Sequence, residues 1–188
     1  MLAPILRSET QARLLAALLL RPDREASIAE LAREIGSDPG NLHDEVERLV
    51  AAGILTDRRV GRSRLLRAAD SPLTRPLAEL LLVGYGPKQA SEAALRGIAG
   101  IEHAYIAGSW AARYLGHNGE FPHDIDVVLV GSPDRDDATE ALVNALSQIG
   151  QDVQVVFRSP RSWTEAQDAF TRTAKSGPIV ELQLTEPR

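Results

Sequence analysis

Residues 39–68 have the sequence PGNLHDEVERLVAAGILTDRRVGRSRLLRA, and this stretch decides the fold expected for the first half of the chain. Four apolar side chains recur at helical spacing before Gly53 ends the run. They are Leu42, Val46, Leu49 and Val50. Two short extended runs then flank Gly61, where glycine allows the chain to reverse as a hairpin. The stretch therefore predicts a helix followed by a two-stranded wing.

Two further helices are expected upstream. The first carries an apolar face and is stopped by Pro22. That face consists of Leu14, Leu15, Leu18 and Leu19. The second begins at Ser27, where Glu30 completes the pattern of a capping box, and it ends at Gly36. Residues 37–40 have the composition of a turn.

Helix, helix, turn, helix and hairpin follow one another in the order of a winged helix-turn-helix. A further helix around Leu73–Leu81 leads away from this unit, and residues 84–87 are the expected hinge. The sequence thus predicts a winged-helix DNA-binding domain over residues 1–84 and a second domain over residues 88–188.

The second half alternates between strand and helix patterns. The expected helices are 88–99, 109–115, a helix with Ala138, Leu142, Leu146 and Ile149 on one face, and 162–175; the expected strands are 103–107, 124–130 and 152–157. Such alternation indicates a small mixed sheet with flanking helices, so the predicted fold class is α/β (α+β).

Two short motifs in the second half point to phosphate and metal chemistry. Gly108-Ser109 joins a strand to the start of a helix, and Asp124 and Asp126 lie two apart on a strand, which puts both carboxylates on one face. Mg²⁺ prefers hard oxygen ligands and usually shares them with substrate phosphates. The pair of motifs therefore predicts a site for a nucleotide with magnesium.

Residues 100–157 resemble the nucleotidyltransferase superfamily related to DNA polymerase beta, through Gly-Ser, a helix and loop, and then Asp-x-Asp in a hydrophobic strand. The resemblance implies that Gly108 and Ser109 contact the triphosphate and that Asp124 and Asp126 bind Mg²⁺. Arg113 lies four residues beyond Ser109 on the same helix face, where it is a candidate phosphate contact; taken alone, it is a surface residue.

The family has a third carboxylate on a neighbouring strand, where this sequence has Gln154. A neutral amide supplies neither a negative charge nor a general base. Asp152 is the candidate substitute, about 6 to 7 Å along the strand from Gln154. Retained and lost catalysis both stay open. Outside the motif, His117 and His123 are expected as exposed loop residues, and Trp110 and Trp163 as packing residues.

The wing has the densest positive charge of the chain, five arginines in ten residues with no acid between them. They are Arg58, Arg59, Arg62, Arg64 and Arg67. This charge suits contact with the phosphate backbone of double-stranded DNA, and the alternative is a solvated hairpin.

The expected recognition helix carries fewer favourable charges. Asn41 and His43 in its first turn are candidates for contact with base edges, and Arg48 for contact with phosphate. Three acids on the same helix are expected to repel phosphate. They are Asp44, Glu45 and Glu47.

Residues 39–68 also resemble winged-helix repressors of the arsenic-responsive and multiple-antibiotic-resistance type, through LxxxVERLVAAGIL followed by RRVGRSR. The resemblance implies a homodimer. The chain has no cysteine, so sensing of metals through thiolates is excluded.

The chain has 188 residues and a net charge of −5. A negative net charge argues against binding to nucleic acid, but the two halves of the chain differ in charge. Residues 1–86 hold 12 arginines and 12 acids, so the whole excess of acid lies in residues 87–188. Neither a signal sequence nor a membrane span is expected, and the expected location is cytoplasmic.

Three functions follow as hypotheses. The first is a DNA-binding transcriptional regulator whose second domain binds a nucleotide-metal ligand or a partner. The second is an active magnesium-dependent nucleotidyltransferase that moves a nucleoside monophosphate from a nucleoside triphosphate to a hydroxyl of a protein, an RNA or a small molecule. The third is a toxin-antitoxin component in which the winged helix binds a partner protein.

Overall fold

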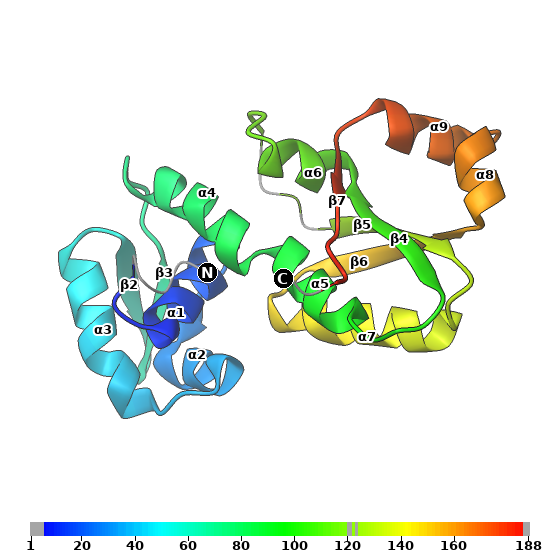
Figure 1. Cartoon of the computed structure of the whole chain (residues 1–188). Coiled ribbons are helices and arrows are strands. Elements are labelled where there is room, and N and C mark those ends of the chain that lie inside the picture. The colour runs from blue at the N-terminus through cyan, green and yellow to red at the C-terminus, as the bar shows by residue number, and fades with distance from the viewer. Residues whose placement is uncertain (1–5, 120–121, 123, 186–188) are drawn as a thin grey trace. The chain divides into compact units, whose positions relative to one another are not determined.

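The computed structural model describes residues 6–119, 122 and 124–185. The chain divides into two compact units, Met1–Gly86 and Pro87–Arg188, each with its own sheet (Figure 1). Helices and strands mix in the chain as the sequence predicted, so the α+β fold class is confirmed.

The first unit consists of α1 (Glu9–Leu19), β1 (Ala26–Ser27), α2 (Ile28–Ile35), α3 (Pro39–Ala51), β2 (Leu55–Val60), β3 (Ser63–Ala68) and α4 (Thr74–Tyr85). The capping box at the start of α2 is confirmed, because Ser27 accepts from the Glu30 N–H and Glu30 accepts from the Ser27 N–H. Gly36 ends α2 with a φ of 67°, a conformation that favours glycine. The unit's core is formed mainly by the buried leucines of α1, α2, α3 and the wing.

The start of α3 differs from the prediction of a turn over residues 37–40. The Asp38 carboxylate accepts from the Gly40 N–H at 2.7 Å, and Pro39 is the first helical residue. Proline suits this position because its fixed φ is helical and its missing N–H would have no helical partner there. Residues 39 and 40 therefore belong to the first turn of α3.

The predicted wing is confirmed as an antiparallel pair of β2 and β3 joined by Gly61 and Arg62. The sheet has the order β1-β3-β2, and β1 was not predicted. It contains only two residues, which is too short for an alternating pattern to be visible in the sequence.

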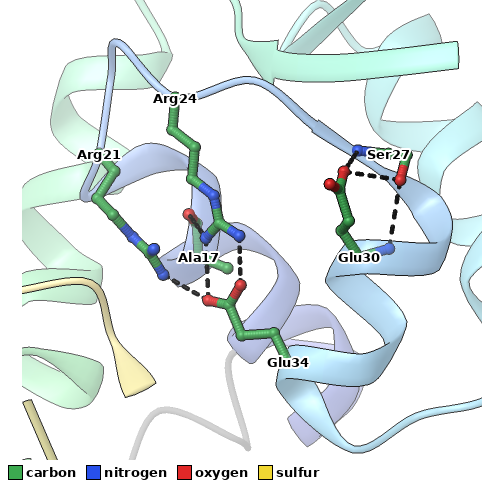
Figure 2. A network of polar contacts seen from close by, with 6 residues as sticks. All are labelled: Ala17, Arg21, Arg24, Ser27, Glu30 and Glu34. Atoms are coloured by element: carbon green, nitrogen blue, oxygen red, sulfur yellow. Dashed lines mark hydrogen bonds and ion pairs between the residues drawn. The ribbon is translucent and has the colours of Figure 1, made fainter. Parts of the chain in front are cut away.

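A polar network ties the loop after α1 to α2 (Figure 2). Glu34 on α2 accepts hydrogen bonds from both Arg21 and Arg24, and Arg24 also donates to the Ala17 carbonyl oxygen at 3.2 Å. Each of the three charged side chains is about one-fifth exposed. The network therefore holds the side chains of Arg21 and Arg24 against the Glu34 carboxylate.

The second unit consists of α5 (Pro87–Leu95), β4 (Ile101–Ala107), α6 (Gly108–Tyr114), β5 (Asp124–Gly131), α7 (Arg135–Gln148), β6 (Asp152–Arg158), α8 (Pro160–Glu165), α9 (Ala169–Ser176) and β7 (Ile179–Glu181). Its strands have the order β6-β5-β4-β7; β5 and β6 are parallel, and the other two pairs are antiparallel. The predicted mixed sheet with flanking helices is confirmed.

The prediction of one last helix over residues 162–175 is wrong. The segment forms α8 and α9, which are separated where Ala166 adopts a φ of 49°. Asp168 starts the new helix by accepting from the Thr171 N–H at 3.0 Å, and it also pairs with Arg158 at 3.0 Å. Together these contacts lower the pKa of the Asp168 carboxyl, with the bonds from Thr171 as the main cause.

One face of this sheet is only partly covered. Tyr105, Trp163 and Phe170 pack against a buried cluster that includes Val128 and Val130, near the carboxyl end of β5. Since side chains on a strand alternate, Asp124 and Asp126 share this face at the other end of β5. Asp124 is exposed and Asp126 is half-buried, so the acids lie where the packing stops.

Trp110 is 1% exposed, which confirms its packing role. Across the residues that the structure describes, no helix combines the length and the apolar character needed to cross a membrane.

Candidate functional site

The exposed side of α3 is the first candidate interface. Buried residues lie along one side of this helix, and they are Leu42, Glu45, Val46 and Leu49. The predicted DNA contacts Asn41, His43 and Arg48 are all exposed. Asn41 lies in the first turn of α3 and His43 begins the second. Their directions differ by about 160°, from the roughly 100° per residue of an α-helix. They therefore flank the outward face of α3 on opposite sides.

Glu45 does not face outward, so the expectation that it repels phosphate is wrong. Its side chain is 9% exposed, and it accepts from Gln11 Nε2 of α1 at 2.6 Å and from Arg48. The sequence contained the signal, because Glu45 stands three residues after Leu42 and directly before Val46, inside the apolar stripe.

Glu47 is exposed, but its charge is paired. Arg64 of the wing donates to Glu47, and Arg64 also donates to Asp57 of β2 at 2.8 Å. The hydrogen bond from Arg64 is the main cause that lowers the pKa of the Glu47 carboxyl. Arg64 therefore connects the recognition helix to the wing, an arrangement between distant residues that no local pattern indicated.

The five wing arginines differ in how far acids compensate their charges. Arg67 is exposed and interacts electrostatically with Glu25. Arg58 donates to both oxygens of Glu25, at 2.8 and 3.0 Å from Nε, and Arg64 is held by Glu47 and Asp57. Arg59 and Arg62 are exposed, and no acid of the described chain forms an ion pair with either. The positive charge that is open to a ligand is therefore concentrated at Arg59 and Arg62.

The second candidate site lies in the other unit, where β4 leads into α6. Gly108 has a φ of 77°, and a Cβ atom placed there would lie 3.0 Å from Oδ2 of Asp126. Ser109 is exposed beside it, and Ala107 pairs with Asp126 across the two strands. The two halves of the motif, Gly108-Ser109 and the aspartate pair, are therefore neighbours in space.

The parallel pairing of β5 and β6 puts Asp152 opposite Asp124 and Gln154 opposite Asp126. Side chains at paired positions of adjacent strands share a face, with strands about 4.8 Å apart. The four side chains therefore lie together on one face of the sheet. The neighbour of Asp126 is the Gln154 amide, and the neighbour of Asp124 is the Asp152 carboxylate.

Burial, and secondarily the charge of Asp124, raises the pKa of the Asp126 carboxyl. A bound cation would relieve both effects, because it offsets the lost solvation and the repulsion between the carboxylates. However, no three acidic or histidine side chains within residues 6–119, 122 and 124–185 converge closely enough to hold a metal ion.

Arg113 is 6% exposed, so the surface position considered for it is wrong. Its Nη1 donates to the His117 carbonyl oxygen at 2.8 Å, which fixes the start of the loop after α6. His117 is exposed as expected, and His123 lies outside the described residues.

Comparisons with known proteins give one family match and similarity to a solved structure. Residues 6–58 match the model of a protein family described as a helix-turn-helix domain. Among solved structures, the reduced form of HlyU from Vibrio cholerae is similar at 23% identity and a TM-score of 0.37, over 42% of this chain and 79% of that chain. No curated protein matches. The predicted helix-turn-helix is thus confirmed for the first unit.

Proposed function

We propose that this protein is a transcriptional regulator that binds double-stranded DNA through its first unit. The match of residues 6–58 to a helix-turn-helix domain carries the proposal. The exposed face of α3 and the open charges of Arg59 and Arg62 support it, since groove contact and phosphate contact need these two features. Asn41, His43 and Arg48 are the proposed α3 contacts, and a homodimer on a palindromic operator is the proposed assembly.

Arg59 and Arg62 are expected to carry most of the salt dependence of DNA binding. Each cation that neutralises a phosphate contributes about 0.9 to the slope of log affinity against log salt. We expect Arg59→Ala and Arg62→Ala each to reduce this slope by about 0.9. Arg58→Ala and Arg64→Ala should reduce it less, because Glu25, Glu47 and Asp57 already pair with these arginines.

The measurement is a fluorescence anisotropy titration of the full-length protein on a duplex from its own promoter region, between 50 and 200 mM salt. Arg96→Ala is the matched control, because it removes an exposed arginine from the second unit. Absence of wild-type binding at the lowest salt would contradict the proposal. Equal slopes for wild type and the Arg59→Ala variant would contradict the role of the wing.

For the second unit we propose binding of a nucleoside triphosphate with Mg²⁺. Asp124 and Asp126 would hold the metal, with Asp152 as the nearest additional carboxylate, and Gly108, Ser109 and Arg113 would contact the phosphates. The neighbourhood of Gly108 and Asp126 supports this proposal, as does the raised pKa of Asp126. Two carboxylates suit Mg²⁺ when substrate phosphates complete its oxygen ligands.

Binding without transfer is favoured over catalysis because Gln154 stands beside Asp126. An amide can orient a ligand, but it cannot accept the proton of an attacking hydroxyl as a carboxylate does. The active nucleotidyltransferase remains the second candidate, and the pairing of Asp152 with Asp124 is the observation that favours it.

Nucleotide binding should depend on the aspartate pair. We expect Asp126→Asn to weaken binding of radiolabelled nucleoside triphosphates in the presence of Mg²⁺ by about tenfold or more, because a metal-held oxygen loses its charge. Asp136→Asn, at an exposed acid in the first turn of α7, is the control. Equal binding by wild type and Asp126→Asn would contradict the site, whereas label transferred to an acceptor by wild type only would favour the enzyme.

A further inference from the structure

Asp44 lies on the line of α3 that points away from the core. Gly40, Asp44, Glu47 and Ala51 repeat at spacings of four, three and four, so they form one stripe along the helix. All four are exposed, and the buried stripe of Leu42, Val46 and Leu49 lies on the opposite side. Asp44 therefore occupies the middle of the outward face, between the flanks that carry Asn41 and His43.

The three acids of α3 differ in whether other side chains compensate their charge. Glu45 is buried against Gln11 and Arg48, and Glu47 is paired with Arg64. Asp44 forms no hydrogen bond or ion pair with any residue that the structure describes. It is therefore the uncompensated acid of this outward face.

The position of a side chain on a helix in the major groove decides what it meets. The middle of the face meets the floor of the groove, where base edges lie, and side chains on the flanks reach the outer base edges or the phosphates. Gly40, one turn before Asp44, adds no side chain that would hold the helix away from that floor. A carboxylate in the middle needs a hydrogen-bond donor there, because DNA otherwise surrounds it with acceptors and negative charge.

The exocyclic amines of cytosine and adenine are the donors that the major groove offers. Adenine presents its N7 acceptor next to the N6 amine, and this acceptor repels the second carboxylate oxygen. Cytosine presents the N4 amine with no acceptor of its own beside it in the groove. A carboxylate in the middle of the face therefore favours cytosine.

We propose that Asp44 reads a cytosine N4 amine in the operator and disfavours duplexes that lack this amine at the corresponding position. This inference rests on the proposed DNA binding, and it assigns to Asp44 a specificity-determining role. The same carboxylate lowers affinity for unrelated DNA, since it then faces acceptors only. Asp44 thus contributes discrimination at the cost of non-specific binding.

The test is selection of binding sites from duplexes with a randomised central region, by the full-length wild type and by Asp44→Ala and Asp44→Asn. We expect sites of the wild type to share a cytosine at one position in each half-site. Asp44→Ala should lose the preference at that position alone and bind random duplex about tenfold more tightly at low salt. Asp44→Asn should shift the preference to adenine, because an amide bonds to adenine N6 and N7 together.

Asp70→Asn is the matched control, since Asp70 is an exposed acid just beyond the base of the wing, and its sites should equal those of the wild type. The proposal is overturned if Asp44→Ala and wild type select the same sites, or if the base lost is not cytosine. In both cases DNA binding itself stands. If the wild type selects no sites and binds no duplex, the proposed function fails together with this inference.

Discussion

Gly131→Ala is expected to lower the free energy of unfolding of the second unit by about 3 to 5 kcal/mol. Gly131 ends β5 with a φ of 136°, and a Cβ atom there would lie 2.1 Å from the Gly100 carbonyl oxygen. Relief would require separating β4 from β5, because Gly131 pairs with Ile101 at the start of β4. The same separation would disturb the pairing that brings Ala107 beside Asp126.

The chain provides its own probe for this measurement, since its two tryptophans, Trp110 and Trp163, both lie in the second unit. Urea denaturation followed by tryptophan fluorescence therefore reports this unit. Gly97→Ala is the control, because Gly97 has a φ of 89° but open space around its Cα, and about 1 kcal/mol of backbone strain is expected there. Equal midpoints for the two variants would show that the contact with Gly100 is unimportant.

Regular elements of this protein could be predicted because their determinants are local. The residues that cap α2, Ser27 and Glu30 at its start and Gly36 at its end, lie within ten residues of one another, and the structure confirms both caps. The hairpin around Gly61 is similar, since a two-residue loop depends on the residues in it. The two-residue β1 has no such pattern, and the break at Ala166 comes where this alanine adopts a φ of 49°, which its residue type does not indicate.

The sequence predicted which residues are candidates for contact with DNA. It did not predict which of their charges are already paired with acids of the same unit. The five wing arginines looked equivalent in the sequence, but Arg58 and Arg64 are paired with acids 33 and 17 residues away. Glu47 meets Arg64 because α3 packs beside the wing, and Glu25 meets Arg58 because the segment before β1 does; neither arrangement is visible in a local spacing. The net charge of the first half therefore does not indicate which of its arginines are unpaired and accessible to a ligand.

The acidic site of the second unit was likewise predicted in part from local pattern, and the rest depends on how the sheet is assembled. Alternation along a strand was enough to place Asp124 and Asp126 on one face. The parallel register that makes Gln154 the neighbour of Asp126 comes from the sheet, as does the approach of Gly108 to that carboxylate. Those two contacts determine what surrounds the Asp126 carboxylate, since one supplies an amide and the other brings the start of α6 close.

Glu34→Gln is expected to lower the free energy of unfolding of the first unit by about 2 kcal/mol, between the values typical of exposed and of buried ion pairs. Glu34 holds Arg21 and Arg24 together (Figure 2), and its side chain is 20% exposed. A neutral amide keeps the shape but leaves two neighbouring guanidinium groups without an anion. Glu79→Gln, from a more exposed pair on α4, is the control and should change stability by less than about 0.5 kcal/mol.

The same substitution should flatten the dependence of this unit's stability on pH. Burial alone would raise the pKa of the Glu34 carboxyl, but the hydrogen bonds and charges of Arg24 and Arg21 outweigh it, so the folded-state pKa lies below its usual value. A depressed pKa contributes stability that is present above the unfolded-state pKa of about 4.3 and lost as the pH falls through the folded-state value. Urea denaturation followed by circular dichroism at pH 7, 5, 4 and 3 measures this loss. We expect wild type and Glu34→Gln to converge in stability toward pH 3, and a constant difference across these pH values would mean that the carboxylate charge is not what holds Arg21 and Arg24.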